Sequence, residues 1–173
     1  MDKSNPKGPG ADATRADFPA SHPYSRTSRH PSHVVLGDQS LLIQCCEILF
    51  ERGHRLLAVV STQPRIVAWC GQHEVACLAS YDDLRPLEFD YLHSITNLTM
   101  LPAWLLDLPK RAAINFHDGP LPRYAGLNAP IWAMIHGESR HGITFHRMQA
   151  RADVARSTFS ASFRFRTTIP ASA

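Results

Sequence analysis

Short apolar runs and longer amphipathic segments alternate along the chain from His33 onward. The short runs are rich in β-branched residues and have few polar interruptions, as strands buried on both faces of a sheet do. These predicted strands are Val34 to Leu36, Leu56 to Val60, Val75 to Leu78, and Phe89 to Ile95. Apolar residues at helical spacing occupy the segments between these strands. The predicted helices run from Ser40 to Gly53, from Pro64 to Gly71, and from Pro102 through Leu106.

The alternation of strands and helices predicts βαβ units and a parallel sheet with right-handed crossovers. The fold class expected from the pattern is therefore α/β. Gly37 ends the first strand, but the chain contains no G-x-G-x-x-G sequence, which is the phosphate-binding turn of dinucleotide-binding domains. Binding of NAD or FAD is not expected.

Three later segments complete the predicted fold. Ala129 to Ile135 is expected to form a helix that Gly137 ends. Gly142 to Met148 alternates like a strand. Between Phe159 and Arg166, apolar residues alternate with serine and arginine, which predicts a half-buried strand with one wet face, antiparallel at an edge of the sheet.

The two ends of the chain differ from its middle. Residues 1–32 are rich in Pro, Ser, Gly, Arg and His and hold only isolated aromatic residues. Such a segment cannot offset its ordering entropy by burial, so we expect a disordered arm. The predicted organisation is this arm, one domain over residues 33–166, and a short tail over residues 167–173.

Composition narrows the function classes. With 173 residues, 44% apolar and 19% charged, the chain can bury the core of one domain without disulfides or metals. The net charge is +3 and the arginines near both ends define no basic face, so nucleic-acid binding is not favoured. No apolar run reaches the roughly 18 to 20 residues of a membrane helix. A cytoplasmic location with reduced cysteines is expected. Cys70, His73 and Cys77 would supply only three ligands, so no metal site is predicted.

The run from Asn115 to Gly126 carries the candidate chemistry. The apolar segment Ala112 to Ile114 precedes it, and two prolines and two glycines then give it an irregular loop. Alternation along a strand sends the side chains of Asn115 and His117 to the same side. Polar residues at the end of a buried strand, followed by such a loop, are typical of a catalytic or ligand-binding position.

Three side chains could serve proton transfer and stabilise an oxyanion. The amide of Asn115 can donate to a developing oxyanion, and His117 can accept or shuttle a proton near neutral pH. Asp153 follows a helix and a strand later, and could return beside His117 to hold its imidazole. Without a neighbouring serine or cysteine nucleophile, these groups fit acyl transfer to an amine that the substrate supplies. Polar residues at a strand end can also be simple caps, and His136, His141 and His146 are expected to be solvated or structural.

The motif and its surroundings resemble the N-terminal catalytic domain of formyltransferases that use 10-formyltetrahydrofolate. The resemblance rests on Asn115-Phe116-His117 and on the loop Leu121-Pro122-Arg123-Tyr124-Ala125-Gly126. It continues through Ala129-Pro130, the strand from Gly142 to Met148, and Asp153. Within the family, the sequence looks most like the amino-sugar formyltransferases and the formyltransferase-like domains of peptide synthetases.

The resemblance implies a fold and a set of roles. The implied fold is a Rossmann-like, mostly parallel sheet with helices on both faces. Asn115 would bond the formyl oxygen, His117 would assist proton movement from the amine, and Asp153 would position His117. Backbone groups of Leu98 to Leu101, in the loop after the predicted strand Phe89 to Ile95, would meet the pterin of the folate. Gly126 would let its own loop pack close to the substrate. The residues implied in folate binding are Leu98, Thr99, Met100, Leu101 and Gly126. The implied partners are the folate, a small-molecule amine and, for the peptide-synthetase branch, a larger synthetase.

Two features depart from the family pattern and leave two functions open. Ala155 stands where family members have a glycine shortly after the aspartate, and a turn with positive φ would be strained there. The C-terminal domain that many members use for substrate recognition is missing from this sequence, and a truncated or altered end is expected. The chain is therefore predicted to be a formyltransferase acting on an amino sugar, amino acid or peptide precursor, or else a catalytically impaired folate-binding or protein-interaction module.

Overall fold

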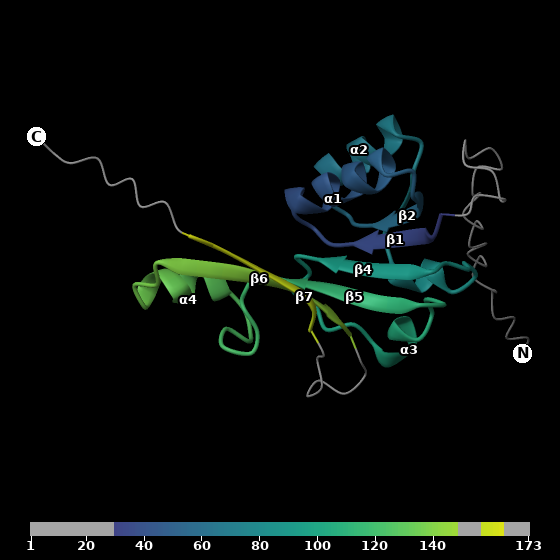
Figure 1. The fold of residues 1–173 in the computed structure, drawn as a ribbon. Helices are drawn as coiled ribbons and strands as arrows, with labels where there is room; N and C mark the ends of the chain where they lie inside the picture. Colours follow the sequence, from purple (N-terminus) through teal and green to yellow (C-terminus); the bar gives the residue numbers. More distant parts are fainter. Residues whose placement is uncertain (1–29, 149–156, 165–173) are drawn as a thin grey trace, which may run out of the picture.

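The computed structural model describes residues 30–148 and 157–164. Within them a seven-stranded sheet has the order β3-β2-β1-β4-β5-β6-β7 (Figure 1). The first five strands are parallel, and the last two are antiparallel to their neighbours. The strands are β1 Ser32–Leu36, β2 Arg55–Val60, β3 Ala76–Leu78, β4 Tyr91–Ile95, β5 Ala112–His117, β6 Arg140–Arg147 and β7 Ser157–Arg164. The α/β fold predicted from the pattern is confirmed.

The helices cover both faces of the sheet, as the resemblance implied. Their bounds are α1 Ser40–Glu51, α2 Pro64–Gln72, α3 Ala103–Leu106 and α4 Ala129–Ile135, with a 3-10 helix, η1, over Tyr81–Leu84. In Figure 1, α1 and α2 lie on one side of the sheet and α3 lies on the other. No helix among the described residues is long and apolar enough to cross a membrane.

The two valines of β1 show why its sequence is apolar from Val34 to Leu36. Val35 packs with α1 and α2, in a cluster that includes Leu42 and Trp69. Val34 points to the opposite face and packs with residues such as Leu84 and Leu105. Both valines are fully buried. Burial on two faces therefore accounts for a strand without polar alternation.

The carboxyl ends of β1 and β4 lie close together because of Gly37. A Cβ at this residue would stand 1.9 Å from the carbonyl oxygen of Ile95, and its φ is +149°. Only glycine can adopt this φ without strain and also leave room for the Ile95 carbonyl oxygen. The chain reaches β3 on one side of β1 and then returns to β4 on the other side, so the strand order reverses between these two strands. In open α/β sheets, ligands bind in the crevice at such a reversal.

β7 forms the antiparallel edge that the alternating C-terminal segment predicted. It pairs with β6 in a register that places Phe159 opposite Phe145 and Phe163 opposite His141. Phe159 is 57% exposed and Phe163 is 47% exposed. The predicted edge position is confirmed, but the predicted half-buried character is wrong, because the phenylalanines expected on the buried face are largely exposed. A strand at the edge has β6 on one side only, and little of the described chain covers it. Residues 1–29 of the predicted arm over residues 1–32, and the predicted tail over residues 167–173, lie outside the described residues. The predicted end of the arm is too late, because Ser32 is buried and already belongs to β1.

Candidate functional site

The candidate site lies at the carboxyl end of β5 and on the β6 residues beside it. Asn115 stands opposite His146 and His117 stands opposite Thr144 across the antiparallel pair. Ala113, which precedes them at the same spacing, packs in the core cluster that also contains Leu105 of α3. Asn115 and His117 therefore face the α3 side of the sheet, on the same side as each other.

His117 is fixed by the loop that follows it. Its Nε2 lies 2.6 Å from the carbonyl oxygen of Tyr124. A carbonyl can only accept, so Nε2 carries the hydrogen in this bond. In the neutral ring, Nδ1 then holds the lone pair. The loop thus sets the tautomer and leaves Nδ1 as the nitrogen that can take a proton from a substrate.

Asn115 is paired with His146, a histidine that the sequence predicted to be solvated or structural and gave no part in the site. Its amide Nδ2 lies 3.2 Å from Nε2 of His146. Burial lowers the pKa of His146, and the nearby His117 adds to this effect, whereas a backbone hydrogen bond at Arg147 opposes it. A neutral His146 can accept one amide hydrogen, which leaves the second hydrogen of Asn115 for a substrate oxygen. The two residues meet because of the register between β5 and β6, and the sequence pattern does not reveal that register.

Thr144 attaches the loop to β6. Its side chain is completely buried. Oγ1 donates to the carbonyl oxygen of Gly119 at 2.9 Å and accepts from the backbone N–H of Leu121 at 3.2 Å. Because one hydroxyl satisfies two backbone groups, the start of the loop is held in a fixed position relative to His117.

Two glycines of the loop have different reasons to be glycine. A Cβ at Gly119 would lie 2.7 Å from Cβ of Ala129, 2.9 Å from the Tyr124 carbonyl oxygen and 3.0 Å from Nε2 of His117. Gly119 therefore makes room for the hydrogen bond that fixes His117. Gly126 has a φ of +106°, while a Cβ there would meet open space. The positive φ, rather than a close contact with another residue, therefore explains why position 126 is a glycine.

Replacing Gly119 with alanine is expected to reduce activity about tenfold or more while the chain stays folded. The added methyl group would push on His117 Nε2 and its carbonyl partner, and small misplacements of catalytic groups cost up to about 10² in rate. Turnover with the best amine substrate would measure this. Gly71→Ala is the matched control, because a Cβ there meets nothing within 4 Å. Equal turnover in both variants would contradict the proposed role of the space at Gly119.

The loop implied in folate binding follows β4, the neighbour of β5. Ser94 of β4 stands beside Asn115, so the loop leaves the sheet next to the candidate site. Asn97 shapes it, donating from Nδ2 to the Thr99 carbonyl oxygen at 2.7 Å and accepting from the Thr99 N–H at 3.2 Å. Leu98 is 75% exposed and Met100 is 84% exposed. The loop that leaves β4 next to Asn115 therefore exposes apolar side chains, which suits a flat ligand.

The third predicted catalytic residue, Asp153, lies outside the described residues. β6 ends at Arg147 and β7 begins at Ser157, which pairs with His146. Asn115 and His117 are thus brought to one face at one strand end, whereas the place of the carboxylate stays a prediction. Among the described residues, no group of three His, Cys, Asp or Glu side chains is arranged to hold a metal ion.

Comparison with known proteins identifies the family to which the chain belongs. The sequence matches the formyl transferase family over residues 69–161, more than half of the chain. It is 33% identical to a methionyl-tRNA formyltransferase of Geobacter sulfurreducens over 140 residues, which are 69% of this chain and 44% of that protein. A methionyl-tRNA formyltransferase of Citrifermentans bemidjiense is 32% identical, with the same two shares. The chain spans less than half the length of these relatives.

Solved structures share the fold at lower identity. Glycinamide ribonucleotide transformylase 1 from Symbiobacterium toebii superposes with a TM-score of 0.68 at 18% identity, covering 78% of this chain and 74% of that one. A sugar 3N-formyl transferase, solved with dTDP and 5-N-formyl-THF, gives a TM-score of 0.64 at 12% identity, covering 80% of this chain and 54% of that one. At these identities the likeness concerns the fold. The extended sequence match carries the assignment, and the chain belongs to the formyl transferase family.

Proposed function

We propose that this domain transfers a formyl group from 10-formyltetrahydrofolate to the amine of a small molecule. The observation that carries the proposal is the state of His117, whose Nε2 is tied to the Tyr124 carbonyl oxygen. The lone pair on Nδ1 is then available, and the Asn115 amide keeps one free hydrogen at the same strand end. An acceptor for one proton and a donor for one oxyanion are what amine acylation requires.

The roles follow from these atoms. The donor supplies a formyl carbon that the amine nitrogen of the acceptor attacks. Asn115 donates its free amide hydrogen to the formyl oxygen as negative charge develops there. His117 takes the amine proton on Nδ1 and returns it to the folate nitrogen as the bond between that nitrogen and the formyl carbon breaks. Asp153 would stabilise the protonated imidazole, a role that rests on the family resemblance.

The donor site fits the residues that follow β4. Leu98 and Met100 are mostly exposed beside the strand end, and Asn97 occupies only the Thr99 backbone groups of this loop. Backbone N–H and C=O groups of Leu98 to Leu101 would read the polar edge of the pterin, while Leu98 and Met100 would cover its ring faces. Gly126 would border the acceptor side.

The acceptor is proposed to be an amino sugar, an amino acid or a peptide precursor. Relatives are named for methionyl-tRNA and glycinamide ribonucleotide as well. An acceptor panel should therefore contain a nucleotide-linked amino sugar, free amino acids, aminoacyl-thioesters, glycinamide ribonucleotide and methionyl-tRNA. Activity with an aminoacyl-thioester would favour association with a larger synthetase.

A second candidate function is a folate-binding or protein-interaction module without turnover. The observation that favours it is Ala155, which replaces a glycine of the family pattern just after Asp153. Loss of the positive-φ turn would misplace the carboxylate but would leave the loop after β4 intact. The enzyme and the folate-binding form of the module therefore share the folate site and differ only in catalysis.

One experiment in two stages separates them. Calorimetric titration with 5-formyltetrahydrofolate, a stable relative of the donor, should show saturable binding to the wild-type chain. Met100→Glu is expected to weaken it about tenfold or more by placing a charge at the ring face, whereas Ile48→Glu on α1, 49% exposed, is the control. Incubation with 10-formyltetrahydrofolate and the amine panel follows. Binding with formylated product supports the enzyme, binding alone supports the folate-binding module, and no binding of the folate overturns both of these functions.

A further inference from the structure

A cavity lies on the other face of the sheet, away from Asn115 and His117. It has a volume of about 420 Å³ and is lined by His33, Tyr91, His93, Ala112, Ile114 and Arg147. Ile114 alternates with Asn115 along β5, so the cavity and the candidate catalytic site use opposite faces. The lining residues come mostly from the amino-terminal halves of β1, β4 and β5. Nothing in the proposed formyl transfer uses this cavity.

One wall of the cavity is a layer of aromatic rings. The ring of His33 stacks on Tyr91 with centroids 5.4 Å apart and on His93 with centroids 5.1 Å apart. Ala112 and Ile114 add an apolar surface beside them. Flat rings and small aliphatic groups make a surface that accepts a planar apolar ligand by stacking.

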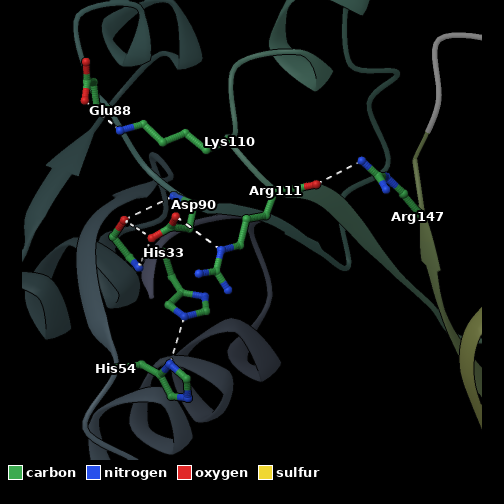
Figure 2. Close-up of polar contacts among 8 residues, drawn as sticks. His33, His54, Glu88, Asp90, Lys110, Arg111 and Arg147 are labelled. Carbon is green, nitrogen blue, oxygen red and sulfur yellow. Dashed lines mark hydrogen bonds and ion pairs between the residues drawn. The ribbon is translucent and has the colours of Figure 1, made fainter. Parts of the chain in front are cut away.

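The histidines of this wall are joined in a chain of hydrogen bonds. Nδ1 of His33 lies 2.9 Å from Nε2 of His93, and Nε2 of His33 lies 3.1 Å from Nδ1 of His54. Figure 2 shows the His33–His54 part of this chain. Both nitrogens of His33 are therefore occupied. Nδ1 of His93 has no hydrogen-bond partner among the described residues, and it stays available to a ligand.

The charges around the cavity are paired, with one exception among the described residues. Lys110 pairs with Glu88 at 2.7 Å and Arg111 pairs with Asp90 at 3.5 Å (Figure 2). Arg147 instead donates from Nη2 to the backbone carbonyl oxygen of Arg111 at 2.9 Å. That bond leaves its positive charge without a carboxylate partner in the described part of the chain. Arg147 thus contributes one uncompensated guanidinium to a mainly apolar cavity.

We propose that this cavity binds a small aromatic carboxylate. The ring of the ligand would stack on the layer formed by Tyr91 and the imidazoles, and its carboxylate would pair with the guanidinium of Arg147. The volume lies within the range of about 300 to 1,000 Å³ that is usual for small-ligand sites. One uncompensated cation favours a monoanion over a phosphate dianion. The apolar floor favours an aromatic body over a sugar.

Titration with 2-naphthoate tests the proposal, using the full chain and heteronuclear NMR. We expect saturable binding with a Kd below about 1 mM and shifts at Tyr91, His93 and Ile114. The neutral isostere 2-naphthamide should bind at least about tenfold more weakly, because it lacks the charge that pairs with Arg147. Equal affinity for the two compounds, or no saturation by naphthoate, would overturn the proposal.

Variants locate the site and separate charge from shape. Arg147→Gln should weaken naphthoate about tenfold and leave naphthamide unchanged, while Arg140→Gln at the exposed other end of β6 should change neither. Ala112→Leu fills the cavity with Arg147 intact and should weaken both compounds. Shifts at Leu98 and Met100 in place of those at Tyr91, or displacement by 5-formyltetrahydrofolate, would place naphthoate in the folate site and refute a separate one. Because the probe needs neither donor nor acceptor, this outcome is independent of formyl transfer.

Discussion

Replacing His117 with glutamine is expected to lower turnover with the best amine by about 10² or more. The side-chain amide of glutamine can reach the Tyr124 carbonyl oxygen in place of Nε2, so the loop contact at 2.6 Å can be retained. It offers no basic nitrogen in place of Nδ1, and loss of a positioned general base costs about 10² to 10⁴ in rate. Steady-state kinetics with saturating 10-formyltetrahydrofolate would measure the change.

The comparison with His117→Ala makes this prediction specific to proton transfer. Alanine removes both the base and the contact with Tyr124, so it should be at least as slow as glutamine and also less stable. His73→Gln removes a histidine from the C-terminal end of α2, away from β5, and should leave turnover unchanged. If His117→Gln kept near wild-type turnover, the imidazole would only support the loop, and the base would have to be another group.

Asn115 extends the same reasoning to the formyl oxygen. Asn115→Asp keeps the size of the side chain but offers oxygens to both His146 and the substrate. A carboxylate repels a developing oxyanion, so this variant should lose about 10² to 10³ in turnover, as removal of an oxyanion donor does elsewhere. Binding of 5-formyltetrahydrofolate should change less than turnover, which separates the catalytic effect from folding.

The parts of the fold that sequence could predict are those set by local periodicity. β1, with Val34 and Val35 buried on opposite faces, is readable because both faces demand apolar residues. The end of β1 was readable from Gly37. By contrast, Phe89 was expected within a strand, but β4 begins at Tyr91. Phe89 is 1% exposed and packs in the core from outside the sheet, so an apolar residue next to a strand looks like part of it.

The candidate site could be predicted from the sequence only in part, because some of its contacts depend on long-range strand pairing. Asn115 and His117 were found because they are close in sequence and lie on one strand. His146, which bonds Asn115, sits 31 residues away, and only the antiparallel register of β5 and β6 brings it there. The chain of His93, His33 and His54 spans three separate segments and gives no periodic signal at all. Contacts of this kind follow from topology, which a single sequence constrains weakly.

The hydrogen-bonded histidines His93, His33 and His54 lead us to predict a large effect of pH on stability. The pKa of His33 is lowered from 6.5 to about 3, chiefly by burial and then by His93 and His54, with Asp90 opposing. The pKa of His93 is lowered from 6.5 to about 4, chiefly by burial and then by His54. The folded chain therefore keeps both rings neutral at pH values where the unfolded chain protonates them. Their full contribution to stability is present above about pH 6.5 and is lost as the pH falls through the folded-state pKa values, about 4 for His93 and about 3 for His33.

We expect the free energy of unfolding to fall steeply between pH 6 and pH 4. Each histidine that binds a proton only when unfolded contributes about 1.4 kcal/mol per pH unit, so the two together set an upper slope of about 2.7 kcal/mol per pH unit. Urea denaturation at half-unit steps of pH would measure the slope. His93→Gln should remove about half of it, because glutamine can still bond His33 but does not titrate. His73→Gln, which removes an exposed imidazole, is the control and should leave the slope unchanged. A free energy of unfolding that stays level down to pH 5 would contradict this prediction. It would mean that His33 and His93 accept protons in the folded chain, so they would not be buried as a neutral pair.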